Sequence, residues 1–227
     1  IRVKAIYGEN KEDLTWQQDR CIFFTTRSGT VKKTALSDFA NVRRGGIIAI
    51  KIVPGDTLIE ARFTTGHDDV ILVTADGQSI RFHEDGVRTM GRSATGVRGI
   101  RLGKDDHVVA LSIVSSDATL LVAGENGVGK RTVFDDYRVQ SRGGKGIKTM
   151  KITKKTGKVI GGLTVHQGDE IMLITVGGQM VRTSVDGIRQ AGRNTQGVRL
   201  VNVDEKDRLQ DIAPVVSAEQ EESAQEE

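Results

Sequence analysis

Lysine and arginine side chains recur at equivalent places along this sequence, and such side chains can bind the phosphate groups of a nucleic acid. Their places are counted from four glycines in matching segments, which we call the anchor glycines. These are Gly29, Gly77, Gly127 and Gly178, which are spaced by 48, 50 and 51 residues. Four residues after the anchors stand the hairpin cations, Lys33, Arg81, Arg131 and Arg182. Fifteen residues after them stand the loop arginines, Arg44, Arg92, Arg142 and Arg193.

Two further sets of cations keep the same register. Eleven residues after the last three anchors stand Arg88, Arg138 and Arg189. Twenty-one residues after them stand Arg98, Lys148 and Arg199, and Lys51 lies one place later in the first unit. Because equivalent sites of repeated units lie on one rim, these cations predict a curved basic track. Such a track matches the phosphate backbone of a bent duplex.

A local structural role is the alternative for each of these cations. Each one could cap a loop carbonyl or pair with a nearby acid, such as Asp38, Asp85, Asp135 or Asp186. This alternative stays open for the hairpin cations. It is weaker for the loop arginines, because flanking glycines let a phosphate backbone approach closely. With six Phe, two Tyr and one Trp, the sequence has too few aromatic residues for single-strand stacking, so duplex binding is favoured.

The elements that position these cations form a tandem repeat. Apolar runs precede the anchors, namely CIFFTT, VILVTA, TLLVAG and IMLITV, and a second strand follows each anchor, which is typical of a hairpin. Each unit ends in another apolar strand within DTLIEARF, DHVVALSI, GKVIGGL or DRLQDIA, and residues 1–7 match that last strand. The spacing predicts an all-β fold, a propeller-like ring of four-stranded blades of about 50 residues each. A solenoid of stacked hairpins is the alternative.

Charge is distributed unevenly along the chain. Residues 217–227 contain five Glu and no Lys or Arg, so the formal net charge of +3 becomes +8 for residues 1–216. We expect residues 1–216 to form the β domain and residues 217–227 to be a disordered acidic tail. The single Cys21 excludes an intramolecular disulfide and fits a reducing cytoplasm. No run of about 18 apolar residues is present, so we expect no membrane-spanning segment.

Other apparent motifs do not support chemistry of their own. Residues 124–131 nearly form a phosphate-binding P-loop, but Arg131 replaces the hydroxyl residue that would bind magnesium, and the context is a hairpin. The histidines are isolated, and one cysteine gives no zinc-binding spacing, so we expect no metal site. The histidines are His67, His83, His107 and His166.

One glycine-rich loop resembles a known motif. The segment Gln140, Ser141, Arg142, Gly143, Gly144, Lys145 and Gly146 is similar to the QRRGGKG box of the C-terminal domain of DNA gyrase A subunits. The segments GTVKKTALSDF, VRTMGRSATGVRGIRL, GKRT and GRNTQGVRL also resemble that family. The resemblance implies a β-pinwheel whose outer rim wraps double-stranded DNA. It also implies a role in negative supercoiling driven by ATP, within an enzyme of two A and two B subunits.

The same resemblance implies where catalysis lies. Strand cleavage in the family uses a tyrosine of a separate domain, with magnesium and ATP bound elsewhere, so we expect no catalytic residue or cofactor here. Tyr7 and Tyr137 occupy apolar positions of the repeat and are interpreted as strand or core residues. The box here is in the third unit and has Ser141 at its second place, whereas the family's box lies in the first of six blades. We therefore expect a fragment without the first blades, which bends DNA without wrapping it fully. The corresponding domain of topoisomerase IV and a protein-binding propeller are the alternatives.

Overall fold

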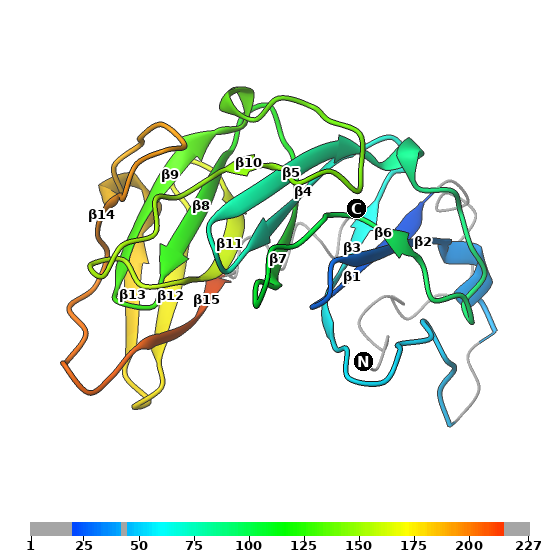
Figure 1. The fold of residues 1–227 in the computed structure, drawn as a ribbon, viewed down its shortest axis with the longest axis horizontal. Helices are drawn as coiled ribbons and strands as arrows, with labels where there is room; N and C mark the ends of the chain where they lie inside the picture. Colours follow the sequence, from blue (N-terminus) through cyan, green and yellow to red (C-terminus); the bar gives the residue numbers. More distant parts are fainter. Residues whose placement is uncertain (1–19, 42–44, 216–227) are drawn as a thin grey trace.

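A computed structural model describes residues 20–41 and 45–215 of the chain. These residues form antiparallel sheets that follow one another along an arc (Figure 1). The expected first strand at residues 1–7, the loop arginine Arg44 and the acidic residues 217–227 lie outside the described residues. The expectations for these three parts of the chain therefore stay predictions.

Each unit begins with an antiparallel hairpin whose turn contains the anchor glycine. The hairpins are β1 (Cys21–Thr26) with β2 (Thr30–Ala35), β4 (Asp69–Thr74) with β5 (Gln78–His83), β8 (Thr119–Gly124) with β9 (Val128–Val133), and β12 (Glu170–Thr175) with β13 (Met180–Ser184). The anchors have φ between 73° and 86°, a conformation that glycine adopts without steric cost. A short 3-10 helix follows each hairpin: η3 (Leu36–Phe39), η4 (Glu84–Gly86), η5 (Phe134–Asp136) and η6 (Val185–Gly187).

The last strand of each unit returns to pair with the first strand of the same unit. These strands are β3 (Leu58–Thr64), β7 (Val108–Ile113), β11 (Val159–Val165) and β15 (Leu209–Val215), as the sequence predicted. They contact one another in chain order along the inner side of the arc (Figure 1). The units are therefore arranged as blades around a common centre.

The fourth strand of a sheet comes from the following unit. The two-residue strands β6 (Val97–Arg98), β10 (Ile147–Lys148) and β14 (Val198–Arg199) pair with β2, β5 and β9, respectively. The first three sheets thus have four strands each, in the orders β3-β1-β2-β6, β7-β4-β5-β10 and β11-β8-β9-β14. The fourth sheet, β13-β12-β15, has three strands among the described residues. This exchange places each cation-bearing loop across the sheet of the preceding unit.

The apolar core fills the spaces between neighbouring sheets. In β4, Val70 and Leu72 pack with Phe23 of the first sheet, while Ile71 and Val73 belong to the cluster shared with the third sheet. Because both faces of the strand are buried, its sequence is continuously apolar instead of alternating. In the described part of the chain, no helix has the length and apolar character needed to cross a membrane.

Candidate nucleic-acid interface

The hairpin cations lie against acidic or carbonyl groups of the protein itself. Lys33 is 5 % exposed, and its Nζ lies 3.8 Å from Glu84 Oε2 and 3.7 Å from Asp85 Oδ1, both in the next unit. Arg81 Nη2 lies 2.7 Å from the Asp69 carboxylate on the neighbouring strand. Of the acids considered from the sequence, Asp85 is thus a partner, and the other partners are different residues.

The same pattern holds in the last two units. Arg131 Nε donates to the Ile188 carbonyl at 2.9 Å, and Arg182 pairs with Glu170. All four hairpin cations therefore bond to acceptor groups of the protein itself, as the structural alternative requires. Their contact with nucleic acid stays a prediction, and the candidate interface is built mainly from other cations.

Two of the loop arginines, Arg142 and Arg193, tie their loops to the unit before. Arg142 Nη1 donates to the Arg98 carbonyl at 3.1 Å, and Arg142 Nε donates to the Gly86 carbonyl at 2.6 Å. In the next unit Arg193 Nη1 donates to the Lys148 carbonyl at 3.0 Å. Arg98 and Lys148 hold equivalent places, so the tie is repeated. Arg142, Arg193 and the equivalent Arg92 are half-buried, which leaves part of each residue accessible.

The glycine-rich loop at residues 140–146 is fastened to the second unit, both to β5 and to the loop that follows β6. Its backbone is held by bonds from Gln140 N to the Arg81 carbonyl, from Gly143 N to the Gly99 carbonyl, and from Arg101 N to the Gly144 carbonyl. Gly146 has φ 75°, and a Cβ there would collide with the Ser79 carbonyl oxygen. This glycine is therefore required by packing on β5. Gly144 has more room, with 3.5 Å to the nearest atom that a Cβ would meet.

A small pocket opens beside this loop. It is lined by Phe82, His83, Gly86 and residues 139–142. The Gln140 Nε2 group is buried and makes no hydrogen bond within the described residues. The neighbouring Lys145 side chain is exposed. The loop thus presents one free lysine and one half-buried arginine at the surface between two units.

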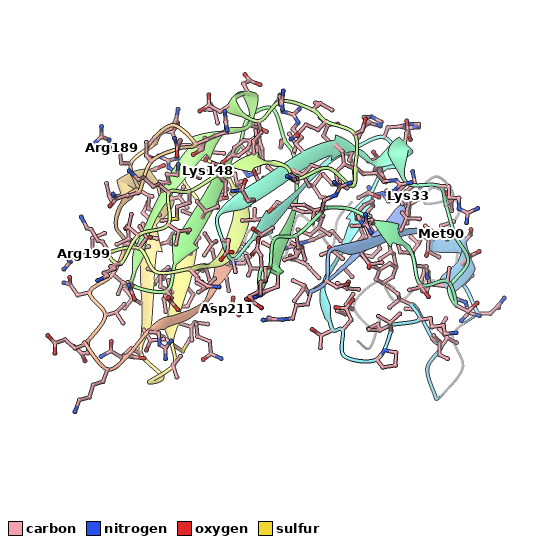
Figure 2. The ribbon with its side chains drawn as sticks, viewed as in Figure 1. Lys33, Met90, Lys148, Arg189, Arg199 and Asp211 are labelled. Carbon is pink, nitrogen blue, oxygen red and sulfur yellow. The ribbon has the colours of Figure 1, made fainter. Side chains whose placement is uncertain are left out.

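The cations at the remaining repeat positions are exposed, and we call them the rim cations. They are Lys51, Arg88, Arg98, Arg138, Lys148, Arg189 and Arg199. Arg199 Nη1 donates to Asn202 Oδ1 at 2.8 Å, and the other rim side chains have no hydrogen-bond or ion-pair partner among residues 20–41 and 45–215. Figure 2 shows Arg189 and Arg199 at the outer edge of the arc, whereas Lys33 lies among the strands of the first sheet. Among the cations of the repeat that the structure describes, the rim cations are therefore the most free to bind a polyanion.

Four further cations near the same loops were not predicted from the repeat. Arg101 and Lys151 are exposed, three residues after Arg98 and Lys148, but their position holds a cation in only two units. Lys32 and Lys130 lie three residues after their anchors and are fully buried. Burial lowers the pKa of each of these two lysines to about 8. Their alternation with apolar residues at this position was the signal that could have found them.

The residues weighed for other chemistry occupy ordinary structural places. Residues 124–131 span the β8–β9 hairpin, and no helix follows them as a P-loop would require. Tyr137 is 1 % exposed, its hydroxyl lies 2.7 Å from Thr149 Oγ1, and burial raises its pKa. In the described ranges no three His, Cys, Asp or Glu side chains come together as a metal site.

Comparison with protein families gives one match that covers all four units. The family described as "DNA gyrase C-terminal domain, beta-propeller" matches residues 22–65, 68–115, 118–166 and 169–215. Each matched segment begins in or next to the first strand of a hairpin and ends at or just after the end of the inner strand of the same unit. Each matched segment thus contains one anchor glycine.

Individual relatives give the same result. The A subunit of DNA gyrase from Salmonella typhimurium is 46 % identical over 202 residues, which are 88 % of this chain and 23 % of the relative. The corresponding protein of Mycolicibacterium smegmatis is 45 % identical over 206 residues, which are 90 % of this chain and 24 % of the relative. The chain therefore spans about a quarter of the length of these relatives.

Solved structures share the arrangement of blades. A DNA gyrase A C-terminal domain superposes with a TM-score of 0.80 at 28 % identity and covers 88 % of this chain and 67 % of its own. The C-terminal domain of a DNA topoisomerase IV gives a TM-score of 0.83 at 25 % identity, over 91 % of this chain and 65 % of its own. The fold is thus common to both kinds of enzyme.

Proposed function

Because this chain belongs to the family of DNA gyrase C-terminal β-propeller domains, we propose that it binds duplex DNA along its outer rim and bends it. The observation that carries the proposal is the set of rim cations, which are exposed and recur unit by unit. Lysine and arginine side chains that neutralise phosphates release condensed counterions, which favours binding at low salt. A row of them on a curved surface is complementary to a curved phosphate backbone.

The proposed binding is tolerant of DNA sequence. The described residues contain strands and single-turn 3-10 helices, and no recognition helix of the kind that enters a major groove. Phosphate contacts position a protein on a duplex but do not read its sequence. Specificity would therefore come from how easily a given duplex bends.

We further propose that the domain is part of a longer polypeptide, the A subunit of a bacterial DNA gyrase, like the relatives that it matches. In that setting the bent duplex would be presented for strand passage by two A and two B subunits. The tyrosine that cleaves DNA, the magnesium ions and ATP would all be contributed by other domains. The cytoplasm, at the nucleoid, is the expected location. The alternative is a scaffold that binds other proteins. The first experiment below distinguishes this alternative from DNA binding.

Fluorescence anisotropy with labelled random-sequence duplexes tests the binding directly. If six to eight phosphates are neutralised, log affinity against log salt has an expected slope of about −5 to −7. A flat salt response, or a clear preference for one sequence over random duplex, would contradict the proposal. No binding to duplex at low salt would favour the scaffold alternative.

A matched pair of triple variants locates the surface. Replacing Arg88, Arg138 and Arg189 by Ala removes three rim cations, and the expected slope becomes shallower by about three. Replacing Lys104, Lys155 and Lys206 by Ala removes the same charge from exposed positions in the turns before β7, β11 and β15. The control should leave the slope nearly unchanged. Equal effects of both triples would show that only net charge matters.

A further inference from the structure

Two lysines are buried beneath the loops that cross from the next unit. Lys32 and Lys130 stand three residues after their anchors, where Ile80 and Val181 stand in the second and fourth units. Both lysine side chains are 0 % exposed. Burial of an ammonium group is costly unless hydrogen bonds replace its water. The partners of these groups therefore indicate the role of each lysine.

The partners of Lys130 are carbonyls of the loop that carries Arg193. Lys130 Nζ donates to the carbonyl oxygen of Gly192 and, at 2.5 Å, to that of Arg193 itself. Thr132 Oγ1 donates to the carbonyl of the neighbouring Ala191 at 2.7 Å. The first turn of this loop is thus held from below by side chains of β9, the strand it crosses.

Lys32 repeats the arrangement two units earlier. Its Nζ donates to the carbonyls of Arg92 and Ala49, each at 2.6 Å, and lies 5.4 Å from the centroid of the Phe24 ring. Arg92 is the loop arginine of the second unit, as Arg193 is of the fourth. The same contact, from a buried lysine to the carbonyl of a loop arginine, therefore occurs twice.

The third unit's loop is held differently. Residues 140–146 lie over Ile80, which offers no donor, and a Cβ on Gly144 would be 3.5 Å from Ile80 Cδ1. Here no lysine of the described residues lies beneath the loop, and the Arg142 side chain bonds to two carbonyls of the preceding unit, whereas Arg193 bonds to one. Lysine support is thus confined to the loops that lack the glycine-rich box.

We infer that Lys32 and Lys130 are positioning residues for DNA binding, which fix the backbone of their loops so that Arg92 and Arg193 meet phosphates. A guanidinium has five N–H donors, and Arg193 uses one on the Lys148 carbonyl, so others remain for a ligand. Without the ammonium group, two loop carbonyls lose their hydrogen-bond donor. The backbone that carries the arginine side chain is then no longer held in place. This inference rests on the proposed function.

NMR of the free protein tests the loop contact without DNA. The variant Lys130→Met keeps the length of the side chain and removes its donors, and Val181→Met at the equivalent place of the fourth unit is the control. The backbone ¹⁵N shifts of Arg193 and Asn194, which follow the two bonded carbonyls, should move in Lys130→Met and not in Val181→Met. Unchanged shifts in a folded Lys130→Met protein would overturn the inference.

The wild-type protein supplies a second readout if Lys130→Met does not fold. The Lys130 ammonium should titrate with a midpoint near 8, since burial lowers its pKa to about 8. The charged groups that influence it are Asp136 and Arg193. The amide shifts of Arg193 and Asn194 should follow the same titration. If the amide shifts of Arg193 and Asn194 did not change as Lys130 titrates, the inference would be contradicted.

A double-variant cycle with duplex DNA separates positioning from general stabilisation. Lys130→Met and Arg193→Ala should each make the slope of log affinity against log salt (the salt slope) shallower by about one. The double variant should have the same salt slope as Arg193→Ala alone. Additive losses would show that Lys130 acts independently of Arg193, against the inference. Unchanged binding by Lys130→Met would also overturn it. If wild-type protein itself shows no salt-dependent duplex binding, the proposed function fails, and the positioning role fails with it.

Discussion

At the scale of single residues, the cations of this repeat divide by what surrounds them. Lys33 is buried beside two acids, whereas Arg138 is exposed without a partner among the described residues. Arg142 is intermediate, because it holds two carbonyls and keeps part of its surface accessible. The same residue type thus supports the fold at one position and is free to bind phosphate at another.

The contrast between Arg138 and Arg142 gives the first prediction. Arg138→Ala should change the free energy of unfolding by no more than about 0.5 kcal/mol, because the side chain is free. Its salt slope with duplex should become shallower by about one. Arg142→Ala should in addition lower the free energy of unfolding by about 1–2 kcal/mol, because two carbonyls lose a charged donor. Urea unfolding and anisotropy at several salt concentrations measure both effects, and equal stabilities would contradict the assignment.

Gly146 and Gly144 give a second matched pair. Gly146→Ala should lower the free energy of unfolding by about 2–4 kcal/mol, because its φ is positive and the added Cβ would meet the Ser79 carbonyl. Gly144→Ala should cost much less, since its Cβ would make ordinary contacts. Thermal and urea unfolding report the difference. If both variants were equally stable, Gly146 would not be required for packing on β5.

At the scale of elements, exchanged strands link each unit to the one before it. Ile147 and Lys148 pair with Ser79 and Gln78, so a loop of the third unit completes the second sheet. The same exchange explains the residue nineteen places after each anchor. It is glycine in the last three units, where a Cβ would meet the preceding unit, and it is the exposed Ile48 in the first.

The sequence predicted the hairpins and inner strands because apolar runs and glycine turns are local signals. It did not predict the exchange, since a two-residue strand such as β6 or β10 has no periodicity to detect. The charge register located the rim cations but could not separate them from Lys33 or Arg81. Their acidic partners lie 12 to 52 residues away in sequence, so the pairing depends on the assembled sheets.

The buried lysines predict a specific dependence of stability on pH. Their folded pKa of about 8 lies below the unfolded value of 10.5, so between these pH values the native state binds fewer protons than the unfolded state. The free energy of unfolding should therefore rise with pH across this window, relative to a Lys32→Met/Lys130→Met variant. Urea unfolding at pH 7 to 10.5 measures the difference. A difference that stays constant or falls would contradict the burial of charged lysines.

At the scale of the whole molecule, the arc of blades makes separate weak contacts act together. Bending 20–30 bp of duplex by 40–90° costs on the order of 1–6 kcal/mol, which one phosphate contact cannot offset. Cations from several units can offset it only if the duplex follows the arc. Binding and bending should therefore be coupled, and both should weaken as rim cations are removed.

End-to-end fluorescence energy transfer on a duplex of about 40 bp measures this coupling, since such a duplex is short against the persistence length of about 150 bp. Wild-type protein and the Lys104/Lys155/Lys206→Ala variant should both shorten the end-to-end distance at saturation. The Arg88/Arg138/Arg189→Ala variant should shorten it less, even at concentrations that saturate binding. A wild-type protein that binds the duplex and leaves the distance unchanged would contradict the proposal that the curved rim bends DNA.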